Sequence, residues 1–318
     1  MLTVIVPASS ANVGSGFDSF GVALSLYNRY QVLDLLPPHT YDIEVIGEGG
    51  KDIAAGENNL IIKSFEAAIA NFGIPPVGLR LRSYNAIPLS RGLGSSASAI
   101  VGGVMLAKAV GKPELSKERL LPLMVELEGH PDNVVPCCMG GFVISAWNGK
   151  EVKYVKLPYF KERIKIVVAV PDVTVDTKKA REVLPQEVSL QDAIFNLSRA
   201  ALLAASWVTG KLENLPWAME DKLHQPYRAK LFPGGEEILE RVKSVPGCLG
   251  VAISGSGPSM LAFVKGDPTR TAKEMCSVFT EKGLRSRFFV LDVDQEGARI
   301  KETKAKMLEE VDRCPTIA

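Results

Sequence analysis

The sequence of 318 residues has few of the residues that build metal clusters or disulfide frameworks. It contains three histidines and five cysteines, and no group of them has the spacing of a zinc site. The odd number of cysteines, with Cys137 next to Cys138, argues against a disulfide framework. We therefore expect reduced cysteines that pack as small core residues.

The sequence also lacks an excess of charge and a long apolar run. Its formal net charge is +1, and no basic run is interleaved with aromatic residues, which argues against nucleic acid or an anionic membrane as a partner. No apolar stretch reaches the length of a membrane helix. Residues 1–7 are typical of a strand, without the basic start and cleavage site of a signal peptide. These absences predict a cytoplasmic protein that binds a small molecule.

What is present is the composition of an ordinary globular protein, with 46% hydrophobic and 23% charged residues. Alternating apolar residues predict strands at residues 2–6, 29–36, 41–46, 77–81, 141–147, 164–170, 249–254, 260–264 and 287–293. Helical periodicity predicts helices at residues 59–72, 95–110, 116–127, 190–209, 217–224, 236–243 and 271–282. The charged stretch 295–310 is typical of a surface helix or a frayed tail. Because β-α-β spacing is absent, we predict an α+β protein with two domains, residues 1–160 and 161–318.

A loop rich in glycine and serine follows a predicted strand and precedes an apolar helix. It consists of Pro88, Leu89, Ser90, Arg91, Gly92, Leu93, Gly94, Ser95 and Ser96. Its glycines can expose backbone N–H groups, and a helix N-terminus adds unpaired donors and partial positive charge, which together suit a triphosphate. The two serine hydroxyls could cap the helix, contact phosphate or bind Mg²⁺. Taken alone, the loop is explained equally well as a plain N-cap after a glycine turn.

The loop differs from the two commonest nucleotide-binding patterns. It has no lysine within it or just after it, which argues against a Walker-type NTPase. The dinucleotide pattern is not satisfied either, because Ser95, Ser96 and Ala97 follow the second glycine.

Polar residues gather in two further segments. Residues 7–18 lead from small side chains to Asn12 and Asp18, which simple turns would also explain. Residues 126–133 contain two glutamates at a predicted helix end, followed by a histidine, an aspartate and an asparagine. Acids at a helix C-terminus oppose the helix dipole, which favours a use such as holding Mg²⁺ by oxygen.

Two other features are ambiguous when taken singly. Residues 254–258 join two predicted strands and are typical of a hairpin turn. Arg181 and Arg228 each offer a planar fork that suits a carboxylate, although a single arginine is more often a surface residue.

Together these segments resemble the GHMP kinases, named for galactokinase, homoserine kinase, mevalonate kinase and phosphomevalonate kinase. The sequence Pro88-x-x-x-Gly92-Leu93-Gly94-Ser95-Ser96-Ala97 is similar to the mark of this superfamily. The segments at 7–18 and 130–134 resemble its homoserine kinase branch, and the similarity runs in order over residues 6–293. The resemblance implies a two-domain α+β fold. Its N-terminal ATP-binding domain would be like the second domain of ribosomal protein S5, and its C-terminal domain would be ferredoxin-like.

The resemblance implies a phosphotransferase of threonine biosynthesis that uses ATP and Mg²⁺ to phosphorylate the hydroxyl of L-homoserine, and that can form a homodimer. The implied ATP site comprises Asn59, Pro88, Leu89, Ser90, Arg91, Gly92, Leu93, Gly94, Ser95, Ser96, Ala97 and Ser98. The implied homoserine site comprises Asn12, Asp18, His130, Arg181 and Arg228. The implied catalytic group is Asn133, Asp132, Glu128 and Thr177, with Mg²⁺ on Ser96 and Glu128 rather than on Glu126.

In the same resemblance the arginines would take the substrate carboxylate, Asp18 its ammonium, and Asn133 would lie near the reacting hydroxyl. Asp132 and Asp18 are the candidate bases, and we expect neither to act as one, because positioning and charge stabilisation can supply most of phosphoryl transfer.

Two alternatives remain at this point. Another GHMP kinase would act on a sugar, mevalonate or an isoprenoid precursor, which would not need a zwitterion site of one acid and two arginines. A binding protein of the same fold would lack the chemistry, yet Ser96, Glu128 and Asn133 are all present.

Overall fold

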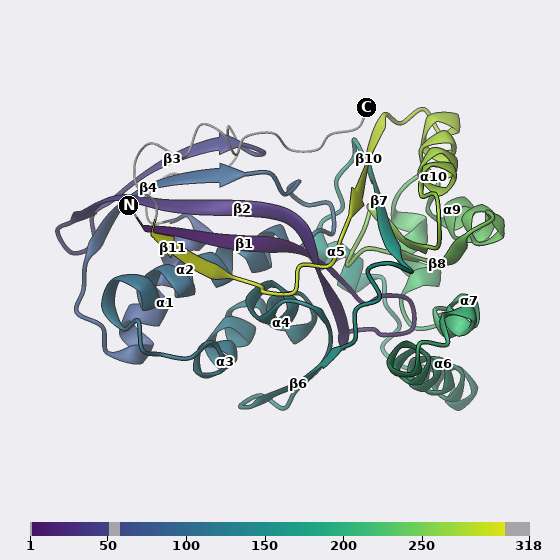
Figure 1. Cartoon of the computed structure of the whole chain (residues 1–318), viewed down its shortest axis with the longest axis horizontal. Coiled ribbons are helices and arrows are strands. Elements are labelled where there is room, and N and C mark those ends of the chain that lie inside the picture. Colours follow the sequence, from purple (N-terminus) through teal and green to yellow (C-terminus); the bar gives the residue numbers. More distant parts are fainter. Residues whose placement is uncertain (1, 51–57, 303–318) are drawn as a thin grey trace.

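The computed structural model describes residues 2–50 and 58–302, which form two α+β halves lying side by side (Figure 1). The elements of the first half are β1 (Leu2–Ala11), β2 (Phe20–Leu36), β3 (Tyr41–Gly47), α1 (Leu60–Phe72), β4 (Gly78–Asn85), α2 (Ser95–Gly111), α3 (Lys117–Glu128), α4 (Pro131–Met139), β5 (Phe142–Trp147) and β6 (Val152–Leu157). Those of the second half are β7 (Lys165–Pro171), α5 (Thr177–Glu182), α6 (Leu190–Thr209), α7 (Leu215–Ala218), α8 (Gln225–Arg228), α9 (Gly235–Arg241), β8 (Cys248–Ile253), β9 (Met260–Val264), α10 (Thr269–Glu281), β10 (Ser286–Leu291) and β11 (Arg299–Glu302).

The first half is a mixed sheet covered on one face by helices. Its strand order is β11-β1-β2-β4-β3, with β5 pairing β2 and β6 pairing β5, and only the β3–β4 pair is parallel among these described strands. Helices α1 to α4 lie below the sheet in Figure 1. Their buried faces share one core with the sheet, because aliphatic residues of β1, β2 and β4 meet those of α1, α2 and α4.

The second half is a four-stranded antiparallel sheet in the order β10-β7-β9-β8. Helices α9 and α10 pack on one face, where Met275 and Phe279 are fully buried. Residues of α6 and α7 pack on the other face in a core that also includes residues of β2 and β5. The buried Trp207 of α6 stands edge-on against Phe142 of β5 at 4.4 Å and Phe263 of β9 at 5.0 Å, and so joins the two halves.

The C-terminal part of the described chain returns to the first sheet. Strand β11 pairs antiparallel with β1, and Asp294 holds the turn before it by accepting hydrogen bonds from the backbone N–H groups of Glu296 and Gly297. The expected helix or frayed tail at 295–310 is therefore wrong over β11, because strand pairing outweighs the charged composition. Residues 303–310 and Cys314 lie outside the described residues. The first half therefore contains a strand from the end of the chain, which a single division at 160/161 does not anticipate.

Two further predictions of local structure are corrected. The helix predicted at 217–224 is instead the end of α7 and a turn, because the Asp221 carboxylate accepts hydrogen bonds from the backbone of His224 and Gln225 and starts α8 there. Strand β1 continues to Ala11, through residues expected to be loop, and the hairpin strand β6 was missed. The helix predicted at 190–209 has the bounds of α6.

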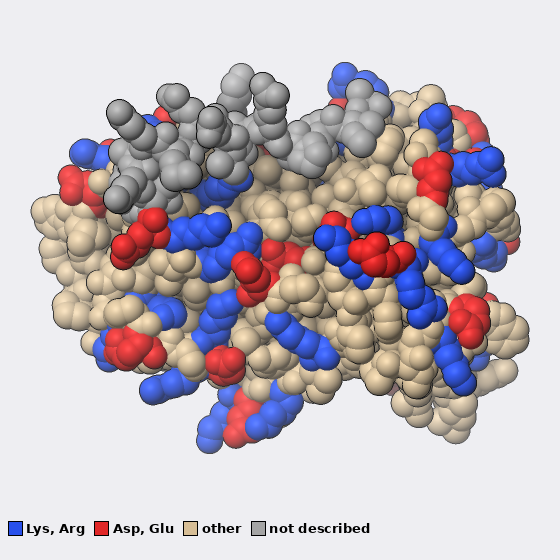
Figure 2. Space-filling model, viewed as in Figure 1, with Lys and Arg blue, Asp and Glu red and all other residues tan. Residues whose placement is uncertain are grey.

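Charged side chains are spread over the surface without a patch of one sign. Figure 2 shows lysines and arginines intermixed with aspartates and glutamates over the visible face. Among the described residues, no helix has both the length and the apolar character that a membrane crossing requires.

Candidate active site

A cavity of about 330 Å³, within the size range of small-molecule sites, lies where the two halves meet. It brings together most of the residues expected in the site: Asn12, Asp18, Asn59, Leu89, Ser90, Arg91, Gly92, Leu93, Gly94, Ser95, Ser96, Glu128, His130, Asp132, Asn133, Thr177, Arg181 and Arg228. Pro88, Ala97 and Ser98 are not among its lining residues. Ala97 and Ser98 are fully buried behind it, where the Ser98 hydroxyl pairs with the phenol of Tyr30 at 3.1 Å.

The glycine-serine loop depends on its two glycines. Gly92 and Gly94 have φ of 72° and 67°, the left-handed region that favours glycine. A Cβ at Gly92 would lie 2.0 Å from the Ser254 carbonyl oxygen, and one at Gly94 would lie 2.1 Å from the Ser9 hydroxyl oxygen. The loop can therefore adopt this path only against these neighbours and without side chains.

Helix α2 starts at Ser95 with its first turn open to the cavity. Its N-cap is Gly94, which makes no side-chain capping hydrogen bond, so the simple serine cap considered from the sequence is not formed. Uncapped N–H groups at the start of a 17-residue helix can bind an anion.

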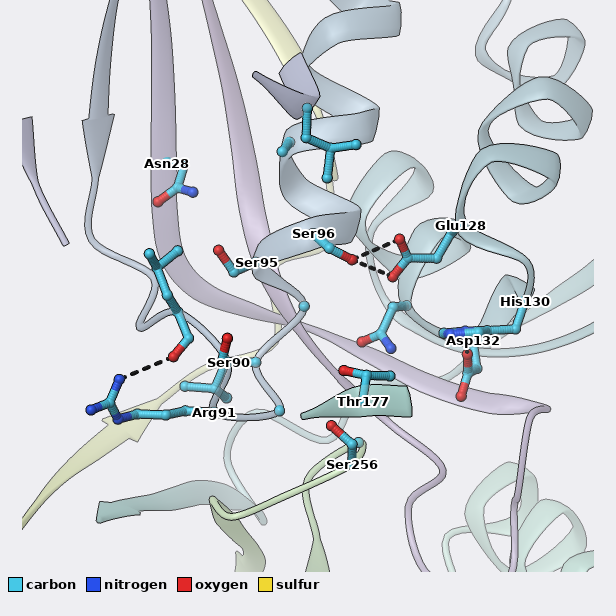
Figure 3. Close-up of a pocket in the computed structure, with 18 of the residues that line it drawn as sticks. Asn28, Ser90, Arg91, Ser95, Ser96, Glu128, His130, Asp132, Thr177 and Ser256 are labelled. Atoms are coloured by element: carbon cyan, nitrogen blue, oxygen red, sulfur yellow. Dashed lines mark hydrogen bonds and ion pairs between the residues drawn. The ribbon is translucent and has the colours of Figure 1, made fainter. Parts of the chain in front are cut away.

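Ser96 and Glu128 meet across the cavity from the start of α2 and the end of α3 (Figure 3). The Ser96 hydroxyl lies 2.6 and 2.7 Å from the two carboxylate oxygens of Glu128. Burial raises the pKa of Glu128 above its ordinary value, although the Ser96 hydrogen bond opposes the shift. Glu126 is exposed and lies outside the cavity.

His130 and Asp132 form a second polar pair at the start of α4. Nδ1 of His130 lies 2.6 Å from Oδ1 of Asp132, whose side chain is almost fully buried. Burial alone would lower the pKa of His130, but the hydrogen bond and charge of Asp132 outweigh it and raise that pKa. A buried carboxylate held by a histidine is poorly placed to reach a substrate hydroxyl.

Asn133 is oriented by β1. Its Oδ1 accepts a hydrogen bond from the Ser9 hydroxyl at 2.8 Å, which leaves the amide NH₂ as the group that can meet a ligand in the cavity. Cys137, one turn further along α4, points the other way and donates to the Pro7 carbonyl oxygen and the Ser9 hydroxyl. Its pKa of about 12, raised by burial, makes it an unreactive core thiol, as expected.

The turn before β2 brings Asp18 to Arg181 of α5. Two hydrogen bonds of 3.0 and 2.9 Å join the Arg181 guanidinium to the Asp18 carboxylate, and they raise the pKa of Arg181. Asn12 shapes this turn by accepting from the Asp18 N–H and donating to the Gly255 carbonyl oxygen. Asn12, Val13 and Asp18 all have positive φ, a strained backbone that is typical of binding sites.

Arg228 is the most unusual group of the cavity. It is 3% exposed, and its guanidinium donates only to the carbonyl oxygens of Ala180 and Gly255, each at 3.1 Å. It forms no ion pair with any carboxylate in the described part of the chain. Burial, opposed in part by the charge of Asp18, lowers its pKa. A buried cation without an acid partner is costly unless an anion occupies the cavity beside it.

An aromatic residue supports both arginines. The guanidinium carbons of Arg228 and Arg181 lie 5.1 and 5.9 Å from the centroid of the Phe17 ring. Phe17 in turn stacks on His224, whose Nε2 lies 2.7 Å from the Gly14 carbonyl oxygen. Burial lowers the pKa of His224, so its neutral ring can support Phe17 without adding charge.

The far end of the cavity contains residues that sequence reasoning largely missed. Asn28, Tyr30, Ile61, Asn85 and Ala99 line it. Of the same region, only Asn59 and Leu60 were expected, from the resemblance. The polar lining residues at the middle of a strand gave no signal, since an alternating pattern does not show which face of a sheet borders a cavity.

Arg91 and two residues of the second half complete the lining. Arg91 turns its guanidinium out of the cavity to the carbonyl oxygens of Leu89 and Pro171 and to Asp172, and so ties the glycine-serine loop to β7. Ser256 and Thr177 face that loop from the second half (Figure 3).

Comparison with known proteins agrees with this geometry. The family model described as the GHMP kinases N terminal domain matches residues 59–141, and the one described as GHMP kinases C terminal matches residues 202–281. A curated homoserine kinase of Carboxydothermus hydrogenoformans is 41% identical over 94% of this chain and 96% of its own length. The chain belongs to the homoserine kinase family of the GHMP kinases.

Other members of the family agree. A homoserine kinase of Moorella thermoacetica is also 41% identical, over 90% of this chain and 95% of that protein. A crystal structure of homoserine kinase from Cytophaga hutchinsonii superimposes with a TM-score of 0.84 at 28% identity, covering 94% of this chain and 97% of that one. A mevalonate kinase structure superimposes with a TM-score of 0.67 at 15% identity and shows the shared fold. The predicted two-domain GHMP kinase fold is confirmed.

Proposed function

We propose that this homoserine kinase family member transfers the γ-phosphoryl group of ATP to the hydroxyl of L-homoserine, giving O-phospho-L-homoserine and ADP. One observation supports the amino-acid substrate above all: the buried Arg228 has no acid partner among the described residues and lies in the same cavity as the Asp18–Arg181 pair. A zwitterion supplies the carboxylate that Arg228 lacks and a cation for Asp18.

The donor site is the glycine-serine loop and the start of α2. Backbone N–H groups of the loop and the helix would bind the phosphates, while the lining around Asn59 and Ile61 would receive the base. The hydrogen bonds of Arg91 to β7 hold the loop against the second half, where the acceptor would bind. Loop and acceptor site are thereby kept in fixed relation, which in-line transfer requires.

Ser96 and Glu128 fit a magnesium site. A hydroxyl and a carboxylate that converge within 2.7 Å of each other are hard oxygen donors of the kind that Mg²⁺ prefers. Within the described ranges no three His, Cys, Asp or Glu side chains gather as a metal cluster, in keeping with an ion held mainly by one or two protein groups and substrate phosphates. Bound there, Mg²⁺ would neutralise phosphate charge.

The acceptor side needs no dedicated base in this proposal. The Asn133 amide NH₂ would orient the substrate hydroxyl, and Thr177 would border it from α5. Asp132 holds His130, which keeps both side chains in place beside the substrate. Because phosphoryl transfer has a loose transition state, positioning and charge stabilisation supply most of the rate.

The proposal includes a cytoplasmic place in threonine biosynthesis, as the resemblance implies. The homodimer also stays a prediction at this stage. A GHMP kinase for a sugar or for mevalonate is the second candidate, but neither acceptor would use a carboxylate site and an ammonium site together. The test is ADP release with ATP and Mg²⁺ on homoserine, compared with mevalonate and galactose. Release with homoserine alone supports the proposal, and no release with homoserine would refute it.

A further inference from the structure

Helix α6 presents an uninterrupted uncharged face to solvent. Four large apolar side chains project from it: Leu190 is 77% exposed, Ile194 56%, Leu197 72% and Val208 55%. The other exposed positions of the helix are Gln191, Ser198, Ala201, Ala205 and Thr209, so none of them is charged. The lower right edge in Figure 2, where Figure 1 places α6, is largely tan. Single exposed apolar residues are ordinary, but an apolar stripe along a whole helix marks an interaction surface.

The stripe has the spacing of a coiled-coil seam. Its apolar positions are separated alternately by four and three residues, and they are Leu190, Ile194, Leu197, Ala201, Ala204 and Val208. The opposite face, with Asn196, Leu203, Ser206 and Trp207, is buried in the protein. The seam is therefore in addition to the face that α6 needs for its own fold.

The order of large and small residues along this seam is self-complementary. If two copies of α6 cross antiparallel about a two-fold axis level with residue 199, Leu197 faces Ala201 and Ile194 faces Ala204 of the other copy. Leu190 then faces Val208 in the same register. Each bulky side chain at the centre meets an alanine, so the layers can interdigitate without overlap.

We propose that α6 is the contact surface of a homodimer, in which two copies pack antiparallel in the register that places Leu197 against Ala201. An isologous contact uses the same patch on both copies, and an antiparallel helix pair meets that condition. A membrane surface is a poorer fit, because the exposed face of the helix has no lysine or arginine to meet lipid head groups.

The size of the surface sets the strength of the dimer. A helix of 20 residues is about 30 Å long and about 10 Å wide, which gives roughly 300 Å² per copy. A standard stable interface buries about 800 Å² per partner. Exposed neighbours extend the patch, since Val188 lies just before the helix and Trp217, 67% exposed, lies on the adjoining α7. We therefore expect a reversible dimer that dissociates in the micromolar range.

Sedimentation velocity of the full chain from about 1 to 200 μM tests the contact. The wild type is expected to pass from monomer to dimer over this range. Leu197→Glu is expected to weaken the dimer by about 100-fold, because the symmetry places the carboxylate in the seam twice and each copy costs about tenfold. Val155→Glu, at an equally exposed apolar site (62%) on β6, is the matched control and is expected to leave the dimer unchanged.

A residue exchange tests the register. Leu197→Ala opens a gap against Ala201, and Ala201→Leu places two leucines against each other, so each single variant is expected to weaken the dimer. The two changes together exchange the partners and are expected to restore the dimer to within a few fold of wild type. Circular dichroism and kinase activity of each variant verify folding, since none of these side chains lies in the cavity.

The outcomes separate the alternatives. A monomer throughout the concentration range, or a dimer that Leu197→Glu leaves intact, overturns the proposal. A dimer that Leu197→Glu disrupts but the double exchange does not restore overturns the register. Binding of the monomer to neutral or anionic vesicles, lost in Leu197→Glu, would assign the surface to a membrane instead.

Discussion

Replacing Arg228 by methionine tests the assignment of the acceptor site. In the structure this guanidinium uses Nε and one hydrogen of Nη1 on carbonyl oxygens, and its remaining donors have no described carboxylate to bind. Methionine retains most of the side-chain volume and removes the charge. Any loss of function then reports the missing cation rather than a cavity.

The expected effect on catalysis is large. A hydrogen bond that involves a charged group contributes about 1.5–3 kcal/mol, and a bidentate pair to the substrate carboxylate about 3 kcal/mol or more. We therefore expect kcat/KM for homoserine to fall by about 100-fold or more, with the KM for ATP changed by less than about threefold.

The expected effect on stability is small. The variant loses two neutral-acceptor hydrogen bonds, worth about 2 kcal/mol, but no longer buries a cation without an acid partner. We expect these terms to offset each other to within about 1 kcal/mol. Thermal or urea unfolding measures the difference, and a folded variant with lost turnover separates binding from folding.

A truncated substrate provides the control. 3-Aminopropan-1-ol is homoserine without its carboxylate, so the wild-type protein should use it about 100-fold less well. If Arg228 binds that carboxylate, Arg228→Met should cost almost nothing further on the truncated substrate, which closes a double cycle. Equal losses on homoserine and on 3-aminopropan-1-ol would refute the assignment.

Three further changes test other parts of the site. Gly92→Ala should reduce turnover by about 100-fold or more, because its Cβ would lie 2.0 Å from the Ser254 carbonyl oxygen at a positive φ; an ATP-binding titration measures the loss, and near-normal binding would contradict this role of the loop. Burial raises the pKa of Glu128, so its carboxylate is protonated as the pH falls through values above the ordinary one. The Mg²⁺ concentration for half-maximal activity should therefore rise toward acid pH in the wild type and depend little on pH in Glu128→Gln; parallel pH dependence in both would exclude Glu128 as the ligand. Asp132→Asn should reduce activity without abolishing it and lower the pKa of His130, measured by NMR, because the Asp132 hydrogen bond and charge raise that pKa; complete loss of turnover with intact folding and homoserine affinity would identify a base.

The local structure could be predicted from the sequence where a segment is long and periodic. The bounds of α6 and the start of α2 at Ser95 follow from apolar period and from the glycine before the helix. Strand β11 could not be predicted, because its pairing with β1 depends on a contact between the two ends of the described chain. A local pattern of charged residues contains no information about such a partner.

The site was predictable as loops but not as contacts. The phosphate loop and the acids near His130 stand out by residue type, whereas the role of Tyr30 depends on which face of β2 borders the cavity. The sequence likewise cannot show that Arg181 is paired with Asp18 while Arg228 is buried without an acid, since this difference arises from packing. That difference is the strongest structural argument for an amino-acid substrate.

The most direct test of the central claim is ADP release by the purified chain with ATP and Mg²⁺, on homoserine, mevalonate and galactose in parallel. The account predicts release with homoserine, formation of O-phospho-L-homoserine in equal amount, and release near background with the other two. Background release with homoserine, or faster release with mevalonate or galactose, would contradict it.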